Sequence, residues 1–357
     1  GDLDVAFFCN SGAEANEGAL KLASKYAGPK RDMIAYTDIS FHGKTMATLS
    51  VSGSEQPNSS SFKTLEGCVC VPYGDAAALE RLFAEHTDAM GFGKCRISTF
   101  IVEAIRSEGV VVPPKGYLAR VRALCTKYDV VLICDEVFCG FGRTGKLFAF
   151  EHDGVVPDIV TMSKAFGAGK ATFAAFVTRP KFFNRAYGSV KEATLHSTTF
   201  NGYGEELVAA ITGMHVLYDE DLIGNSERVG AYLLTGLRKL KEKYPRLISE
   251  VGGIGLLTCL RTENAMAKSM SMLAPNAERG RETFAKITTA GIISELYTKH
   301  DILTYTPLHD SGQILITPPL IVSVEEIDRF ITALDDVLAS NVLEHGMRLA
   351  KRAFGLI

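Results

Sequence analysis

The sequence has no tryptophan, no C-x-x-C pair and no apolar run long enough to cross a membrane. Its 38 basic and 41 acidic side chains give a formal net charge of −3. This charge provides no electrostatic reason to expect nucleic acid as a partner. No signal peptide opens the chain, and we expect no contact with a membrane. The absence of tryptophan by itself excludes nothing.

The eight cysteines lack the spacing of a zinc site or of a redox pair. Several lie inside apolar runs such as 131–134, where a free thiol packs as a small apolar side chain. We therefore expect no disulfide framework and no metal site. Reduced, buried thiols favour a cytoplasmic location.

Short apolar runs alternate with helical patterns over the first 200 residues or so, which is typical of an α/β fold. Runs that are apolar throughout predict strands buried on both faces of a sheet. We expect a mostly parallel central sheet with helices on both faces. The expected strands are 5–9, 33–36, 68–72, 99–103, 130–134, 158–162 and 173–178, and the expected helices include 13–26, 76–85 and 118–128.

An apolar-periodic segment that ends near residue 218 marks the predicted boundary between a large domain, residues 1–218, and a smaller C-terminal α+β domain, residues 219–357. Gly291 is expected to end one helix of the smaller domain, and Ser323 with Glu326 predicts a capping box at the start of the last helix. The other elements expected there are helices at 226–243 and 277–290 and strands at 255–260 and 314–316.

The stretch 130–146, VVLICDEVFCGFGRTGK, resembles three nucleotide-binding patterns. Its G-x-G-x-x-G at 140–145 begins too far beyond the strand for a dinucleotide fingerprint, and no full helix follows it. Leu147 stands where a P-loop needs a hydroxyl group. What remains is Asp135 at the end of an apolar strand, where a buried carboxylate requires a cationic partner or a strong donor.

Two further stretches end at the same predicted edge of the sheet. Ser11 and Glu14 read as a capping box at a helix start, whose exposed N–H groups form an anion site. Lys164 follows the apolar run 158–162, and a desolvated lysine there is a usable nucleophile. Each feature alone is weak, because many helices start with serine and many lysines at strand ends only reach for solvent. Lys170 is a rival candidate.

Phe41 and His42 add an aromatic ring and a ring nitrogen in a loop after another strand-like run. Together, these groups are complementary to pyridoxal 5′-phosphate (PLP). The helix start would take the phosphate, Phe41 would stack on the ring, Asp135 would keep the pyridine nitrogen protonated, and Lys164 would bind the aldehyde covalently. The protonated ring would be the cation that Asp135 requires.

The sequence resembles the class III pyridoxal-phosphate aminotransferases, the group of ornithine, acetylornithine and ω-amino-acid transaminases. The resemblance covers the large domain with the family's order and spacing, the small domain more loosely, and implies a fold-type-I PLP-dependent transferase. The matching stretches are NSGAEANEGALKLA (10–23), FHGKTMATLS (41–50), IVEAIRSEGVVVPPKGYL (101–118), ICDEVFCGFGRTGKLFAFEHDGVVPDIVTMSKA (133–165) and HSTTFNG (196–202).

The resemblance implies that Lys164 and Asp135 are the catalytic residues. Thr199 would reach the phosphate of the neighbouring subunit's cofactor, so a homodimer with shared active sites is implied. The implied cofactor-binding residues are Ser11, Gly12, Ala13, Phe41, His42, Glu103, Asp135, Val137, Lys164 and Thr199.

The sequence departs from the family pattern at four points. Residues 103–108, EAIRSE, stand where the family usually has E-P-x-Q-G-E, so that Arg106 replaces a glutamine. Phe138 stands where many members have a glutamine or a small aliphatic residue beside the cofactor. Leu315 stands where amino-acid-specific members place an arginine that clamps the substrate α-carboxylate. Family members also carry a longer segment before the N-S-G stretch. We therefore expect either a fragment, which a larger modular protein would explain, or a chain whose start is not represented.

The expected function is PLP-dependent transfer of an amino group from an amino acid or amine donor to an aldehyde or ketone by a ping-pong mechanism. The missing arginine favours an ω-type acceptor without an α-carboxylate, although Arg106 could hold a carboxylated donor from the opposite wall. Two alternatives stay open. One is another PLP reaction on the same fold, an aminomutase or a decarboxylase, and the other is a non-catalytic or nucleotide-binding α/β protein.

Overall fold

The computed structural model describes residues 3–55, 61–87, 94–262, 277–307 and 310–340. The chain forms two compact units. Unit 1 comprises Gly1–Ser107, Pro113–Gly142 and Lys146–Asp221, and unit 2 comprises Glu108–Val112, Arg143–Gly145 and Leu222–Ile357. The division lies three residues beyond the predicted boundary, and two short segments of the predicted large domain belong to unit 2. The predicted domain functions stay predictions.

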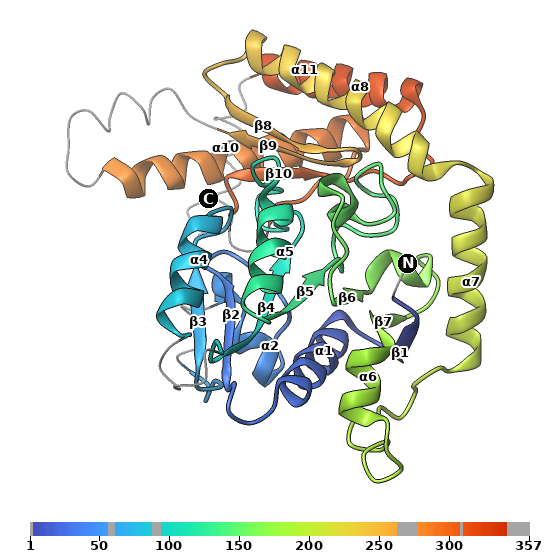
Figure 1. Ribbon diagram of the computed structural model, residues 1–357. Coiled ribbons are helices and arrows are strands. Elements are labelled where there is room, and N and C mark those ends of the chain that lie inside the picture. The colour runs from blue at the N-terminus through green and yellow to red at the C-terminus, as the bar shows by residue number, and fades with distance from the viewer. Residues whose placement is uncertain (1–2, 56–60, 88–93, 263–276, 308–309, 341–357) are drawn as a thin grey trace. The chain divides into compact units, whose positions relative to one another are not determined.

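Unit 1 is built on a seven-stranded sheet with the strand order β1-β7-β6-β5-β4-β2-β3 (Figure 1). β7 runs antiparallel to both of its neighbours, and the other neighbouring pairs are parallel. The prediction of a mostly parallel sheet is therefore confirmed. The strands are β1 Val5–Cys9, β2 Met33–Thr37, β3 Cys68–Val71, β4 Ile97–Glu103, β5 Val131–Asp135, β6 Ile159–Met162 and β7 Ala174–Thr178.

Helices cover both faces of this sheet. Neighbouring residues of a strand point to opposite faces, and all residues of β5 are buried, so both of its faces are covered. Ile133 packs in a core with Leu20 and Leu22 of α1, whereas Cys134 lies near Cys125 of α5. The described α-helices of unit 1 are α1 Gly12–Ala27, α2 Met46–Ser50, α4 Ala76–Glu85, α5 Tyr117–Lys127, α6 Pro180–Tyr187 and α7 Gly204–Asp219.

The strand directions bring several chain segments to one edge of the sheet. β1 is antiparallel to β7 and β7 is antiparallel to β6, so β1 runs in the same direction as β6 and the parallel strands beside it. The residues that follow β1, β2, β4, β5 and β6 therefore lie at a common edge, where open α/β sheets bind their ligands.

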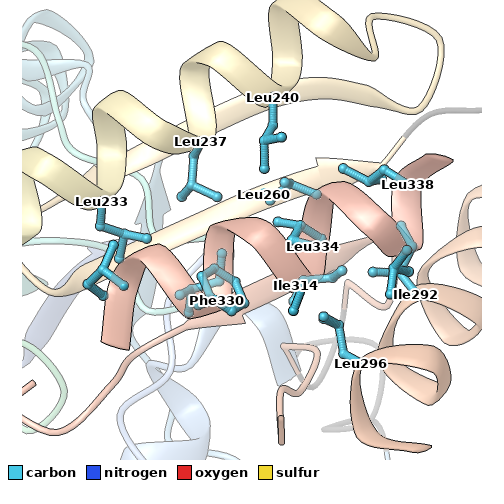
Figure 2. Packing of buried hydrophobic residues seen from close by; sticks show 14 of the residues in the cluster. Leu233, Leu237, Leu240, Leu260, Ile292, Leu296, Ile314, Phe330, Leu334 and Leu338 are labelled. Carbon is cyan, nitrogen blue, oxygen red and sulfur yellow. The ribbon is translucent and has the colours of Figure 1, made fainter. Parts of the chain in front are cut away.

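Unit 2 contains a three-stranded antiparallel sheet of order β10-β9-β8 and three helices that pack on one core. Figure 2 shows leucines of α8 above residues of α11, α10 and the sheet. The elements are α8 Leu222–Lys243, β8 Ile248–Ile254, β9 Leu257–Thr262, α10 Ala277–His300, β10 Gln313–Ile316 and α11 Val324–Ala339. The predicted capping box of α11 is confirmed, since Ser323 and Glu326 bond each other's backbone N–H groups at 3.2 and 2.8 Å.

Two features of unit 2 differ from the prediction. α10 continues through Gly291 to His300. Ile292 and Leu296 beyond that glycine are fully buried in the core, and this burial outweighs the low helix propensity of glycine. β8 was not predicted, because glycines at its end (Gly252 and Gly253) interrupt the alternation of apolar residues.

All eight cysteines are free; Cys68 is half-buried, Cys70 is exposed and the others are buried. Among the described residues, no helix combines the length and apolar character that a membrane crossing requires.

Candidate active site

Asp135, the last residue of β5, is the centre of a buried polar cluster at the ligand-binding edge of unit 1. Its side chain is 3% exposed. Oδ2 accepts a hydrogen bond from Nδ2 of Asn16 at 2.7 Å and lies 2.7 Å from Nδ1 of His42. Oδ1 accepts the N–H of Val137 at 3.0 Å. These contacts to both oxygens fix the orientation of the carboxylate, and no lysine or arginine pairs with it in the described part of the chain.

Asn16 was missed in the sequence, although its side chain bridges two parts of the cluster. It lies in α1, is 1% exposed, and donates both to Asp135 and to the carbonyl oxygen of His42 at 2.9 Å. The available signal was an amide on a helix face otherwise lined by alanine and leucine, since a buried amide needs partners. Oδ1 of Asn16 and Nε2 of His42 are buried without a partner among the described residues, so the cluster has unused polar capacity.

The start of α1 forms as the sequence predicted, with one difference. Oγ of Ser11 accepts the N–H of Glu14 at 3.2 Å. The carboxylate of Glu14 accepts the N–H of Asn10 at 2.9 Å and the hydroxyl of Ser11, rather than the N–H of Ser11 that a strict capping box would use. The N–H groups of Gly12 and Ala13 have no acceptor among the described residues and can bind an anion.

Gly12 brings this helix start close to the residue that follows the Asp135–Glu136 pair. A Cβ atom at position 12 would lie 2.9 Å from Cγ1 of Val137, closer than carbon atoms pack. The free N–H groups of α1 and the carboxylate of Asp135 are therefore parts of one site.

Glu103 ends β4 beside Asp135 in the sheet register and is buried. Its Oε2 accepts the N–H of Phe41 at 3.1 Å, and its Oε1 accepts the N–H of Ser107 at 3.0 Å. Burial raises the pKa of Glu103 above its ordinary value, and the nearby His42 acts in the opposite direction. Glu103 thus fixes the loop that carries Phe41, whose side chain is half-buried; stacking of Phe41 on a cofactor stays a prediction.

Lys164 begins the single 3₁₀ turn η4, Lys164–Gly167, just beyond β6. It is exposed, and its Nζ lies 5.4 Å from the centroid of the Phe138 ring. No carboxylate lies within ion-pair distance of it among the residues described. Phe138 follows Asp135 by three residues, so Lys164 lies next to the Asp135 cluster. Thr199, in contrast, is exposed and makes no hydrogen bond to that cluster.

The geometry thus assembles a fixed buried carboxylate, unpaired N–H groups at a helix start and an unpaired lysine. A ligand that satisfies all three carries a cationic or hydrogen-bond-donating group, an anionic group and an electrophilic carbon. PLP has these groups, and the residues present fit it.

The profile of the family described as "Aminotransferase class-III" matches residues 1–338. The chain is 32% identical to Aminotransferase PigE of Serratia sp. (strain ATCC 39006) over 365 aligned residues, which cover 94% of this chain and 41% of that protein. It is also 32% identical to the uncharacterized aminotransferase C27F1.05c of Schizosaccharomyces pombe over 341 residues, 94% of this chain and 66% of that protein.

Among solved structures, the ornithine aminotransferase of Toxoplasma gondii, whose active site holds PLP at partial occupancy, superposes with a TM-score of 0.80. It is 28% identical, and the match covers 96% of this chain and 74% of that one. The chain therefore belongs to the class III aminotransferases, a family of PLP-dependent enzymes with the fold that the sequence predicted. It spans less than two thirds of the length of the two relatives named above.

The backbone of Lys164 generates a prediction about stability. Its φ of +46° lies in the left-handed region, which costs residues other than glycine about 1–2 kcal/mol. We expect the free energy of unfolding of cofactor-free Lys164→Gly to exceed that of Lys164→Ala by up to about 1 kcal/mol. The difference is smaller than the strain itself, because glycine also increases the conformational entropy of the unfolded chain. Urea denaturation of the two variants measures the difference. An alanine variant more stable than the glycine variant by 0.5 kcal/mol or more, roughly the usual preference for alanine, would contradict a strained Lys164.

Proposed function

We propose that this chain is a PLP-dependent transaminase that moves an amino group from an amino acid or amine donor to an aldehyde or ketone by a ping-pong mechanism. The observation that carries the proposal is the buried, three-fold hydrogen-bonded Asp135 beside an unpaired lysine. PLP, when bound, supplies an electron sink for the substrate carbon that loses its proton. The protein supplies binding, orientation and proton transfer.

Asp135 is proposed to hold the proton of the pyridine nitrogen. Asn16, His42 and the N–H of Val137 keep its carboxylate in place, so that one orientation is presented to the ring. Lys164 is proposed to be the residue that would hold the cofactor at its aldehyde group, and its amine would accept and return the proton of the substrate carbon. Its side chain is exposed and makes no ion pair among the described residues, so it is available for both roles.

The phosphate is proposed to bind the N–H groups of Gly12 and Ala13 and the hydroxyl of Ser11 at the start of α1. Thr199 of the second subunit is proposed to reach the same phosphate. Its exposure, and its lack of hydrogen bonds to the Asp135 cluster in its own chain, agree with a role across a subunit boundary.

Two lysines compete for the covalent role, and their variants separate them. We expect wild-type protein with PLP to absorb near about 420 nm through the bond between lysine and cofactor. Lys164→Ala should lose this band and amino-group transfer to a ketone, whereas the matched control Lys170→Ala should keep both. The reverse result would transfer the role to Lys170. A wild-type protein that shows the band but transfers no amino group to a ketone would instead favour an aminomutase or a decarboxylase.

A homodimer is supported by the outer face of α7. Val208, Ile211 and Tyr218 are between 49% and 65% exposed, and their spacing places them on one stripe of the helix. The opposite face buries Ala210 and Leu217. A helix that is apolar on both faces needs a second partner, and for this stripe we propose a second copy of the chain.

The dimer prediction uses a charge placed in this stripe. Ile211→Glu should shift the protein from dimer to monomer in analytical ultracentrifugation, because an isolated buried carboxylate is strongly disfavoured. Leu303→Glu is the matched control, since Leu303 is an exposed leucine of unit 2. A wild-type monomer that retains PLP on dilution would refute the shared site.

The acceptor is proposed to lack an α-carboxylate. Leu315, at the position of the family's arginine, is buried in β10 next to Cys259 of β9. Arg261, two residues along β9, already pairs with Asp310. A carboxylate at Leu315 would meet apolar surface and lose hydration without a bidentate partner.

The buried cysteines, none of which forms a disulfide, support a proposed cytoplasmic location.

A matched pair of acceptors tests this specificity. We expect kcat/KM for an aliphatic aldehyde to equal or exceed that for the 2-oxo acid of the same chain length. Leu315→Arg should raise kcat/KM for the oxo acid by about tenfold, roughly 1.4 kcal/mol, if a carboxylate reaches this position. Stopped assays of amino transfer measure both constants. A tenfold preference of the wild type for the oxo acid would contradict the proposal.

A further inference from the structure

We propose that Gly213 of α7 is a positioning residue for Lys164, because its missing side chain lets α7 lie directly against the turn that carries the lysine. The proposal rests on the role of Lys164 proposed above. It concerns a residue outside the cluster around Asp135.

The contact between Gly213 and Ala168 leaves no room for a side chain. A Cβ atom at position 213 would lie 2.4 Å from Cβ of Ala168 and 3.5 Å from its Cα. Carbon atoms pack at about 3.5–4.0 Å, so the two atoms would have to separate by more than about 1 Å. The Cβ of alanine is fixed to the backbone and has no rotamer that moves it away. Relief therefore requires a shift of α7 or of the turn.

Gly213 lies at the middle of the buried face of α7. Ala210 and Leu217 flank it at helical spacing and are 2% and 5% exposed. Among the described helices and strands, η4 is the element with which α7 has its most extensive contact. A displacement of α7 at Gly213 therefore acts on η4 first.

η4 is also held by aromatic packing. The ring of Phe166 lies 4.9 Å from that of Phe141 and 4.7 Å from that of Phe173. Because Phe166 is buried against these rings, a movement of the turn would have to displace packed aromatic side chains.

A displacement of Ala168 is transmitted to Lys164 through a single turn of backbone. The N–H of Ala168 bonds to the carbonyl of Ala165 at 2.9 Å, and the N–H of Phe166 bonds to the carbonyl of Ser163 at 3.0 Å. Lys164 and Ala168 have φ values of +46° and +53°, so left-handed residues bound the turn at both ends. Such conformations persist only where the surroundings impose them. We infer that Gly213 is part of those surroundings.

The experiment is a rescue cycle with a control on the same helix. Gly213→Ala introduces the clash, and Ala168→Gly removes the atom that it meets. Gly204→Ala is the matched control, because a Cβ there meets nothing within 4 Å. Alanine favours helix more than glycine does, so weaker helix formation is not expected in Gly213→Ala.

The first readout is the dissociation constant of PLP, measured by absorbance. We expect Gly213→Ala to raise it about tenfold, the equivalent of roughly 1.4 kcal/mol, because the displaced Lys164 would no longer meet the cofactor aldehyde. Ala168→Gly alone should stay near wild type, since glycine suits a positive φ. The double variant should return most of the way, and Gly204→Ala should change nothing.

The second readout does not need the cofactor. Hydrogen exchange of a peptide covering residues 163–171 in the cofactor-free protein should be faster in Gly213→Ala and restored in the double variant. Wild-type exchange and wild-type affinity in Gly213→Ala would overturn the proposal, as would a loss that Ala168→Gly does not rescue. If the wild type failed to bind PLP but the double variant restored the exchange, the proposed function would be rejected. The packing of Gly213 on Ala168 would still be supported.

Discussion

The site depends on one buried carboxylate with fixed donors. Asp135 receives an amide of α1, an imidazole from the loop after β2 and the N–H of Val137. Asn16 and His42 lie 119 and 93 residues before Asp135 in the sequence, so α1 and the loop after β2 are brought to the same point, whereas Val137 lies two residues beyond Asp135. A carboxylate held in this way presents one orientation and keeps its affinity for a cation, which is what a pyridinium ring requires.

The sheet makes this convergence possible. Because β1 and the parallel strands around β5 share a direction, the start of α1, the Phe41–His42 loop, Glu103, Asp135 and the Lys164 turn all lie at one edge. Close packing then sets the fine positions. Gly12 allows α1 to approach Val137, and Gly213 allows α7 to approach Ala168, which follows the turn that carries Lys164.

Sequence and structure disagree where tertiary packing outweighs local preference. Gly291 was expected to end a helix, but α10 passes through it because the residues beyond it are buried in the core of unit 2. β8 escaped notice because its glycines break the alternating pattern. The capping residues Ser11 and Ser323 were found from sequence, because capping depends on a few neighbouring residues and is little affected by distant contacts.

The sequence alone determined the α/β class, most strands of the central sheet, the helix starts and the identity of Asp135 and Lys164 as the charged residues at strand ends. It could do so because periodicity, capping and family motifs are local in the chain. Only the tertiary structure decided that Asn16 holds Asp135, that Glu103 holds the loop of Phe41, and that Gly213 packs on Ala168. These contacts join residues between 45 and 119 positions apart, apparent only after folding, and no local pattern encodes them.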